Sequence, residues 1–400
     1  MRILVVTQYF WPEIFRINDL VIGLKERGHE IIVLTGKPNY PSGSFFEGYS
    51  FFGKSTDTWN GIKIYRSGLI PRGRGTGIRL MLNYLSFALL STFKALMVSE
   101  RPDCIFVYEP SPITVGLPAI LAKRKFKVPI YFWVQDIWPH SLTSAGNINN
   151  SFVIGLVDNI TRWIYKKCDK ILIQSEAFRS IIEKQGVSSE KIIYFPNWSE
   201  DYYIPLEKQD AYRSYFSGKF NLVFAGNIGE AQDFNTLIQT AAIVNKSLPE
   251  LHWVILGRGR MLEEAKRRIK ALNLENCFKF AGSFPSEEMP GFFSHADALI
   301  VSLKRDPIFS ITIPSKIQSY LACGKPILTS LDGEGSRIIT EAQAGISSPA
   351  SSPEILSHAI LQFISLPESV RTEMGNSARK YYERVFNRSI LIDKLVSIIE

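Results

Sequence analysis

The sequence has few cysteines, no long uninterrupted apolar run and no export signal, and each of these features excludes some classes of protein. Its four cysteines are scattered, with neither a CxxC pair nor a neighbouring histidine, which favours a reducing compartment over a disulfide framework or a zinc site. The chain opens directly on a strand-like run, so we expect no leader peptide. Because it also lacks Ser/His/Asp, HExxH, Walker A and DNA-binding motifs, we expect no metal, no cofactor and no nucleic-acid partner.

The most apolar long segment spans residues 80–98 and is interrupted by Asn83 and Lys94. A membrane-spanning helix needs about 20 mainly apolar residues, so we predict a helix with an apolar face and no transmembrane span. Basic residues lie on both sides of it in the sequence, at 72–79 and at 123–127. Two interpretations remain open: a helix lying on an anionic membrane surface, or a core helix beside a solvated basic loop.

The order of strand-like and helical segments predicts two domains. A chain of 400 residues is too long for one core, and strands alternate with helices along its first half and again after residue 198. We therefore predict an α/β protein with two doubly wound parallel sheets that face each other across a cleft. The expected domains are residues 1–197 and 198–384, with a C-terminal helix at about 385–400 that crosses back to the first domain.

One segment of the second half points to an anionic ligand. Residues 314–324 read as a helix that starts at Pro314, ends at Gly324 and leads into a buried strand. Lys316 lies in the first turn, where a cation opposes the helix dipole while free N–H groups attract anions. A diphosphate lying between them would explain the lysine, and a net charge of +8 fits an acidic ligand. The alternative is a solvated lysine on an ordinary helix.

Glycines at two strand ends support the same interpretation. Gly226, Asn227 and Gly229 follow the first strand of the second half, and Arg258 lies between two glycines after the next strand. Glycines in such places let backbone N–H groups approach a phosphate, and the arginine can pair with it. Either glycine pair alone is weak evidence, but together with Lys316 they predict an anion-binding cleft.

Polar residues also follow other predicted strands. Glu13 and Arg16 lie where the first loop enters a helix, and Arg16 is a second cation suited to phosphate. Asn18 is expected to be the N-cap of that helix. Asp136 can hold a sugar hydroxyl or be an ordinary turn aspartate. Glu334 can accept a hydroxyl hydrogen bond or simply favour a helix start.

Several short motifs together resemble the GT-B glycosyltransferases of the retaining family 4, over essentially the whole chain. Residues 28–35 (GHEIIVLT), the pair at 197–198 (NW) and residues 322–327 (ACGKPI) are similar to that family's characteristic elements. The closest similarity is to the bacterial O-antigen and capsule L-fucosamine (N-acetyl-L-fucosamine) transferases. It rests on residues 15–19 (FRIND), 38–41 (PNYP), 135–139 (QDIWP) and 313–316 (IPSK).

The resemblance implies a metal-independent glycosyltransferase, although the family's two donor-site glutamates are replaced by Ile311 and Ser319. It implies a UDP-sugar donor, specifically UDP-N-acetyl-L-fucosamine, and a polyprenyl-diphosphate-linked sugar acceptor at the cytoplasmic face of the inner membrane. A UDP-sugar 2-epimerase and a non-catalytic scaffold remain as alternatives. The predicted nucleotide contacts are Gly226, Asn227, Gly229, Arg258, Ser315, Lys316 and Glu334, and the predicted catalytic residues are Asp136, Glu13 and Arg16.

Overall fold

The computed structural model describes residues 1–75, 77–144, 150–217 and 219–400. They form two compact units. Unit 1 comprises Met1–Pro196 with Ile392–Glu400, and unit 2 comprises Asn197–Leu391. The chain therefore passes between the units at residue 196 and again within its last helix, whereas the sequence analysis placed these passages at residue 197 and near residue 385.

Unit 1 is built on a sheet that has eight strands among the described residues, in the order β3-β4-β2-β1-β5-β6-β7-β8. All neighbouring strands are parallel except β3 and β4. The central strands are apolar and buried on both faces, as expected where helices cover both sides of a parallel sheet. The strands are β1 (Arg2–Val6), β2 (Glu30–Gly36), β3 (Thr56–Trp59), β4 (Ile62–Ser67), β5 (Cys104–Glu109), β6 (Ile130–Val134), β7 (Lys170–Ile173) and β8 (Ile192–Tyr194).

The hairpin of β3 and β4 was missed in the sequence analysis. β3 is a short edge strand whose four residues are polar or aromatic and partly or fully exposed, so it lacks a buried run. Its antiparallel pairing also departs from the purely parallel sheet that we predicted. An antiparallel edge strand on an otherwise parallel sheet is common, and it leaves the alternating strand-helix core unchanged.

The helices of unit 1 include one at the far C-terminal end of the chain. In the last helix, Lys394 Nζ donates to the carbonyl of Tyr194 at 2.8 Å, and Asp393 pairs with Arg27. No helix within the described residues has the length and hydropathy needed to cross a bilayer. The helices are α1 (Arg16–Glu26), α2 (Gly77–Ala95), α3 (Gly116–Phe126), α4 (His140–Ser144), α5 (Ser151–Lys167), α6 (Phe178–Lys184) and, beginning in unit 2, α15 (Arg388–Ile399).

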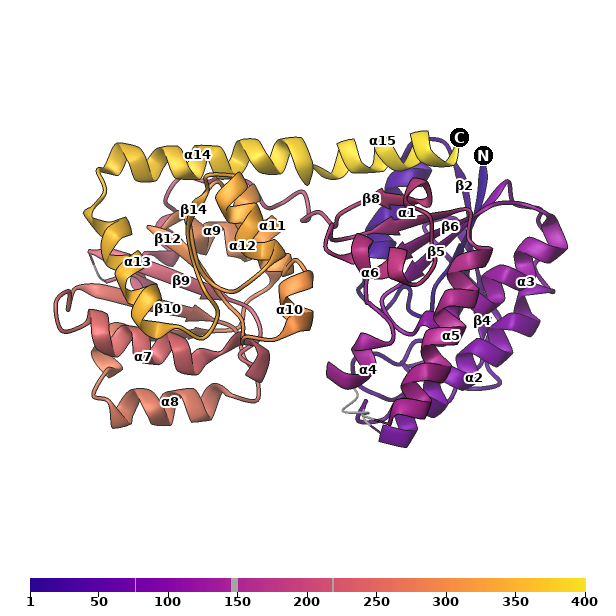
Figure 1. The fold of residues 1–400 in the computed structure, drawn as a ribbon, viewed down its shortest axis with the longest axis horizontal. Helices are drawn as coiled ribbons and strands as arrows, with labels where there is room; N and C mark the ends of the chain where they lie inside the picture. The colour runs from indigo at the N-terminus through magenta and orange to yellow at the C-terminus, as the bar shows by residue number, and fades with distance from the viewer. Residues whose placement is uncertain (76, 145–149, 218) are drawn as a thin grey trace. The chain divides into compact units, whose positions relative to one another are not determined.

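Unit 2 has a parallel sheet in the order β11-β10-β9-β12-β13-β14. Four of these strands, β9, β10, β12 and β14, are labelled in Figure 1. This strand order is the Rossmann order, in which the chain winds outward in both directions from the centre. Ligands of such sheets bind beyond the carboxyl ends of the strands near the point of reversal, here beside β9. The strands are β9 (Phe220–Ala225), β10 (Leu251–Leu256), β11 (Phe278–Gly282), β12 (Ala298–Ser302), β13 (Ile327–Ser330) and β14 (Gly345–Ser348).

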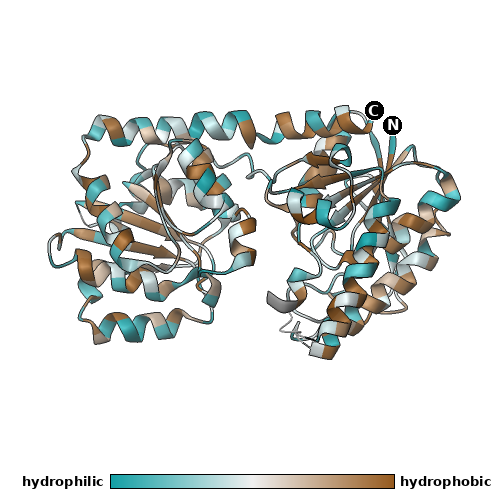
Figure 2. Ribbon diagram, viewed as in Figure 1, coloured by the Kyte–Doolittle hydropathy of each residue, from teal (hydrophilic) through white to brown (hydrophobic). Residues whose placement is uncertain are grey.

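Two apolar layers hold the helices of unit 2 against the sheet. Alternate residues of β9 supply opposite faces: Leu222 and Phe224 join one buried cluster, and Val223 and Ala225 the other. The strands are accordingly brown in Figure 2, where brown marks hydrophobic residues. The helices are α7 (Phe234–Val244), α8 (Leu262–Ala271), α9 (Met289–Ser294), α10 (Pro307–Ile311), α11 (Ser315–Ala322), α12 (Glu334–Glu341), α13 (Pro353–Ser365) and α14 (Glu368–Val385).

Candidate functional site

A cavity of about 610 Å³ opens at the carboxyl ends of β9 and β10 and is closed on one side by the start of α11. We call it the unit 2 cavity. One part of its wall is aromatic and apolar, and another carries two cations, the glycine loops and hydroxyl groups; none of the described residues that line it is acidic. It is lined by Tyr203, Ala225, Gly226, Asn227, Gln232, Leu256, Gly257, Arg258, Ser283, Phe284, Ser286, Met289, Phe293, Ser315, Lys316, Ser319 and Tyr320.

Lys316 is the second residue of α11 and its ammonium group has an unusual environment. Its Nζ lies 3.6 Å from the centre of the Phe224 ring, and no ion pair joins it to a carboxylate within the described residues. Burial therefore lowers the pKa of Lys316 to about 7. A half-buried lysine that has no carboxylate partner among the described residues is suited to receive an anion, which argues against the alternative of a fully solvated lysine.

The glycines of the two strand-end loops allow close packing around Lys316. Gly226 has φ +128°, and a Cβ there would lie 2.7 Å from Lys316 Cε. Gly257 has φ +132°, and its Cβ would lie 1.9 Å from the Gly226 carbonyl oxygen. The Ile228 N–H also donates to the Arg258 carbonyl at 2.9 Å, which joins the two loops. Because Gly226 and Gly257 have no side chains, the two loops can pack this closely and place Asn227 and Arg258 on the cavity wall.

A tyrosine in the second half of α11 holds this helix against β9. Tyr320 OH accepts a hydrogen bond from the Ala225 N–H at 3.0 Å. Pro314 is the N-cap and not the first helical residue as predicted, and Ser315 begins the helix. Ser319, the position of one missing family glutamate, lines the cavity and hydrogen-bonds Tyr203. Ile311, the other position, ends α10.

Two predicted nucleotide contacts lie elsewhere. The Gly229 N–H donates to Gln232 Oε1 at 3.1 Å, and Gly229 is not part of the cavity wall. Glu334 begins α12 and forms an ion pair of 3.0 Å with Arg337, three residues later on the same helix. This pairing fits the helix-start interpretation of Glu334 that the sequence analysis left open.

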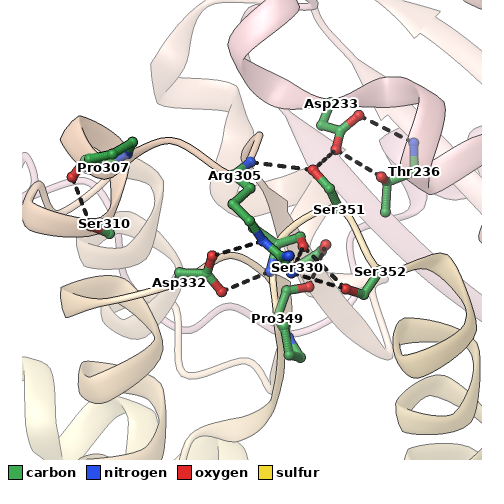
Figure 3. Close-up of polar contacts among 11 residues, drawn as sticks. Asp233, Thr236, Arg305, Pro307, Ser310, Ser330, Asp332, Pro349, Ser351 and Ser352 are labelled. Atoms are coloured by element: carbon green, nitrogen blue, oxygen red, sulfur yellow. Dashed lines mark hydrogen bonds and ion pairs between the residues drawn. The ribbon is translucent and has the colours of Figure 1, made fainter.

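The loops beyond β12, β13 and β14 are joined by a polar cluster (Figure 3). Arg305 pairs with Asp332 at 3.5 Å and donates to the Ala350 carbonyl at 2.8 Å. Ser351 Oγ donates to Asp233 Oδ2 at 2.7 Å, and Asp233 is the N-cap of α7. These contacts join three strand ends and one helix start, so the side of the sheet that carries the cavity is braced.

In unit 1, Glu13 organises two loops. Its Oε1 accepts from the N–H groups of Asn39 and Tyr40, both at 2.7 Å, and its Oε2 accepts from the Phe10 N–H at 3.2 Å. Burial outweighs these hydrogen bonds and raises the pKa of Glu13 to about 7. The contacts show a bracing carboxylate, and its catalytic role stays a prediction.

Arg16 is the first residue of α1, and Phe15 is its N-cap. The prediction that Asn18 caps the helix is therefore wrong, because the helix begins two residues earlier. Asn18 instead bridges the preceding loop: its side chain donates to the Glu13 carbonyl at 2.7 Å and accepts from the Trp11 N–H at 3.2 Å. The cation at the start of α1 thus lies where we expected it.

Asp136 lies just beyond β6, near a second acid that the sequence analysis missed. Burial raises the pKa of Asp136 to about 6, against the opposing effect of a hydrogen bond from Ser111. Glu109 ends the adjacent strand β5, is fully buried, and accepts a hydrogen bond from Trp138 Nε1 at 3.0 Å. Burial and the nearby charge of Asp136 raise the pKa of Glu109 well above its usual value. The sequence did carry a signal for Glu109, because a carboxylate ends an otherwise apolar strand.

Comparison with known proteins identifies the family. Residues 15–198 match the family described as "Glycosyl transferase 4-like domain", and residues 208–381 match "Glycosyl transferases group 1". The chain belongs to the group 1 glycosyltransferases. It is 24% identical to the "Putative colanic acid biosynthesis glycosyl transferase WcaI" of Escherichia coli K12 over the full length of both chains. It is 25% identical to the "Amylovoran biosynthesis glycosyltransferase AmsK" of Erwinia amylovora over 45% of this chain and 44% of that one.

Solved structures show that this glycosyltransferase has the GT-B fold. The structure of Anabaena Alr3699/HepE in complex with UDP superposes with a TM-score of 0.71 at 13% identity, covering 100% of this chain and 99% of that one. An Escherichia coli enzyme titled "Trehalose-6-phosphate", bound with UDP-2-fluoro glucose, gives a TM-score of 0.72 at 10% identity, with the same coverage. The predicted fold class is thus confirmed. Across the described part of this glycosyltransferase, no cluster of acidic, histidine or cysteine side chains is arranged to hold a metal ion.

Proposed function

We propose that this glycosyltransferase transfers a sugar from a UDP-sugar to a lipid-linked acceptor during synthesis of a bacterial surface polysaccharide. The observation that carries the proposal is the unit 2 cavity, where Lys316 lies beside two glycine loops and has no carboxylate partner in the part of the chain that the structure describes. Its aromatic part suits a base, and its cationic part suits a diphosphate. WcaI and AmsK, named for colanic acid and amylovoran synthesis, support the polysaccharide context.

Charge neutralisation at the donor diphosphate is the main catalytic contribution that we propose for unit 2. Lys316, Arg258 and the free N–H groups at the start of α11 would stabilise the negative charge that develops on the leaving UDP. This set supplies the role without a metal ion, so we propose metal-independent transfer. The Gly226 and Gly257 backbones would let the phosphates approach closely.

The proposed reaction retains the configuration of the donor sugar. The bond from the anomeric carbon to the UDP oxygen breaks, and an acceptor hydroxyl forms the new bond on the same face. The proton of that hydroxyl passes to the departing phosphate, so no enzymic nucleophile is needed, and positioning and electrostatics supply the catalysis. Asp136 and Arg16 of unit 1 would contact the acceptor, and Glu13 braces the loop that precedes Arg16.

The donor and acceptor that we propose follow from the resemblance of four short motifs to L-fucosamine transferases. The donor is UDP-N-acetyl-L-fucosamine, and the acceptor is a polyprenyl-diphosphate-linked sugar at the cytoplasmic face of the inner membrane. Such an acceptor lies in a bilayer, so the enzyme would be peripheral to that membrane.

Calorimetric titration of the purified protein with UDP, GDP, ADP and NAD tests the proposal first. We expect UDP alone to bind, because the other ligands differ in the base or in the group beyond the diphosphate. UDP-sugars would then be incubated with and without a lipid-linked acceptor. Release of UDP only when the acceptor is present supports transfer, whereas an epimerised UDP-sugar formed without acceptor would indicate a 2-epimerase. Binding of none of the nucleotides would favour a scaffold.

A further inference from the structure

Helix α2 presents large apolar side chains to solvent and mostly small or polar ones to the interior. Its buried residues are Asn83, Phe87, Ala88, Ser91 and Ala95. This reverses the usual pattern of a surface helix, and many α2 residues are brown in Figure 2. The exposed residues recur every three or four positions and form one row, here called the apolar stripe: Ile78 (72% exposed), Met81 (50%), Leu85 (53%), Leu89 (59%), Phe93 (59%) and Met97 (66%).

Cations lie at both ends of the apolar stripe. Arg72, Arg74 and Arg79 precede or open α2. At the other end, Lys125 Nζ donates to the Leu96 carbonyl at 2.7 Å and to the Val98 carbonyl at 2.6 Å. These bonds bring the basic cluster of residues 123–127 beside the end of the stripe. Long cationic side chains flanking an apolar face are suited to the boundary between acyl chains and anionic headgroups.

A cavity of about 300 Å³ lies beside the second half of α2, and we call it the Lys37 pocket. Lys37 is 2% exposed, and its ammonium donates to the Lys54 carbonyl. Arg66 is paired with Asp57 at 3.2 Å, which leaves Lys37 and Lys94 without a carboxylate among the described residues. The pocket is lined by Lys37, Phe51, Phe52, Gly53, Ser55, Arg66, Ser67, Gly68, Leu90, Phe93, Lys94 and Met97.

The Lys37 pocket combines positive charge with an apolar rim. Burial, followed by the charge of Arg66, lowers the pKa of Lys37 to about 8, and burial lowers the pKa of Lys94. An anion in the pocket would offset the free-energy cost of burying these two charged lysines. Phe93 and Met97 belong to both the stripe and the pocket wall, and Phe52 at the rim is 94% exposed. An anionic ligand attached to hydrocarbon matches both parts.

We propose that unit 1 binds an anionic phospholipid bilayer through the apolar stripe, with the phosphate of one lipid in the Lys37 pocket. This deepens the proposed function, because it rests on the peripheral membrane location required by a lipid-linked acceptor. Burying apolar surface in the bilayer is favourable, and the stripe offers several large apolar side chains, which suffice together for reversible attachment. The cations at the stripe ends add attraction to anionic lipid.

Vesicle sedimentation of the full chain tests this inference. The vesicles would contain phosphatidylcholine alone, or phosphatidylcholine with phosphatidylglycerol. We expect the wild type to bind the anionic vesicles and the double variant F93S/M97S to bind them at least about tenfold more weakly. We expect Lys94→Gln to lose much of the preference for phosphatidylglycerol. The matched control is Ile355→Ser, which removes an apolar side chain of 49% exposure from unit 2 and should change nothing.

Four outcomes would overturn the inference. Wild-type protein that binds neither vesicle, or a double variant that binds as the wild type does, would exclude the stripe as a membrane surface. An unchanged lipid preference in Lys94→Gln would exclude the Lys37 pocket. A wild-type dimer that F93S/M97S makes monomeric would show that a second copy covers the stripe. UDP titration of the same proteins separates the two proposals: UDP binding without vesicle binding refutes only the lipid inference, and vesicle binding without UDP binding refutes only the donor assignment.

Discussion

Replacing Lys316 by methionine should stabilise the protein while weakening its nucleotide binding. Burial moves the pKa of Lys316 from 10.5 to about 7, so the folded chain binds fewer protons there than the unfolded chain. The cost is full below pH 7 and disappears as the pH rises toward 10.5. Each pKa unit corresponds to about 1.4 kcal/mol. Allowing for the partial exposure of the residue, we expect Lys316→Met to add about 2–4 kcal/mol at pH 6 and about 1–2 kcal/mol at pH 9.

Thermal unfolding and calorimetry measure the two effects. For a unit of this size, 1 kcal/mol shifts Tm by about 2–4 °C. The rise in Tm of Lys316→Met over the wild type should therefore be large at pH 6 and small at pH 9. The lost charged hydrogen bond should weaken UDP binding by at least about tenfold. In the wild type, UDP binding at pH 8 should take up close to one proton, seen as a dependence of the binding enthalpy on the buffer.

Lys325→Met is the matched control, because Lys325 is a second desolvated lysine of unit 2 with different partners. Its ammonium donates to the carbonyls of Ser294 at 2.9 Å and Ala296 at 3.2 Å. Removing it leaves those carbonyls unpaired, so we expect lower stability and unchanged UDP affinity. The reasoning fails if Lys316→Met is less stable than the wild type at pH 6, or if UDP binding takes up no proton at pH 8.

Three further substitutions test other parts of the site. Gly257→Ala places a Cβ 1.9 Å from the Gly226 carbonyl oxygen, so urea titration should show a loss of about 2–4 kcal/mol, with weaker UDP binding. Asp136→Asn should lower kcat and remove a limb near pH 6 from the profile of kcat/KM; a profile unchanged in shape would contradict a role for this carboxyl. Glu109→Gln should leave the free energy of unfolding at pH 5 within about 1 kcal/mol of the wild type and raise it at pH 8. The reason is that a carboxyl group with a raised pKa in the folded state costs stability as the pH increases. A variant less stable than the wild type at pH 8 would show that the carboxylate is needed.

Features carried by local chemistry could be predicted from the sequence. Apolar runs alternating with helical patterns indicated both sheets, and glycines after β9 and β10 indicated loops that now line the unit 2 cavity. Lys316 was expected at the start of a helix and lies there on the wall of the same cavity, while the anion that it would bind stays a prediction. In each case the signal lies within a few neighbouring residues.

Features that depend on contacts between distant segments could not be predicted. Glu13 meets the N–H groups of Asn39 and Tyr40, and Asn18 returns to the loop before its helix, so neither role is visible in local spacing. The edge strand β3 has no buried run to reveal it. The same holds for Lys37, whose burial follows from the arrangement of three separate segments around it.

The two half-buried lysines of unit 2 show why a functional site is easier to locate from a residue's environment than from its type. Lys325 is satisfied by carbonyls, and its burial is explained by the structure that it holds together. Lys316 faces a phenylalanine ring and gains no carboxylate, so the folded protein keeps it at a cost that its own contacts do not offset. Proteins retain such local conflicts mainly where a ligand resolves them. The conflict at Lys316 is therefore a stronger argument for a phosphate-binding site than the positive charge of the cavity as a whole.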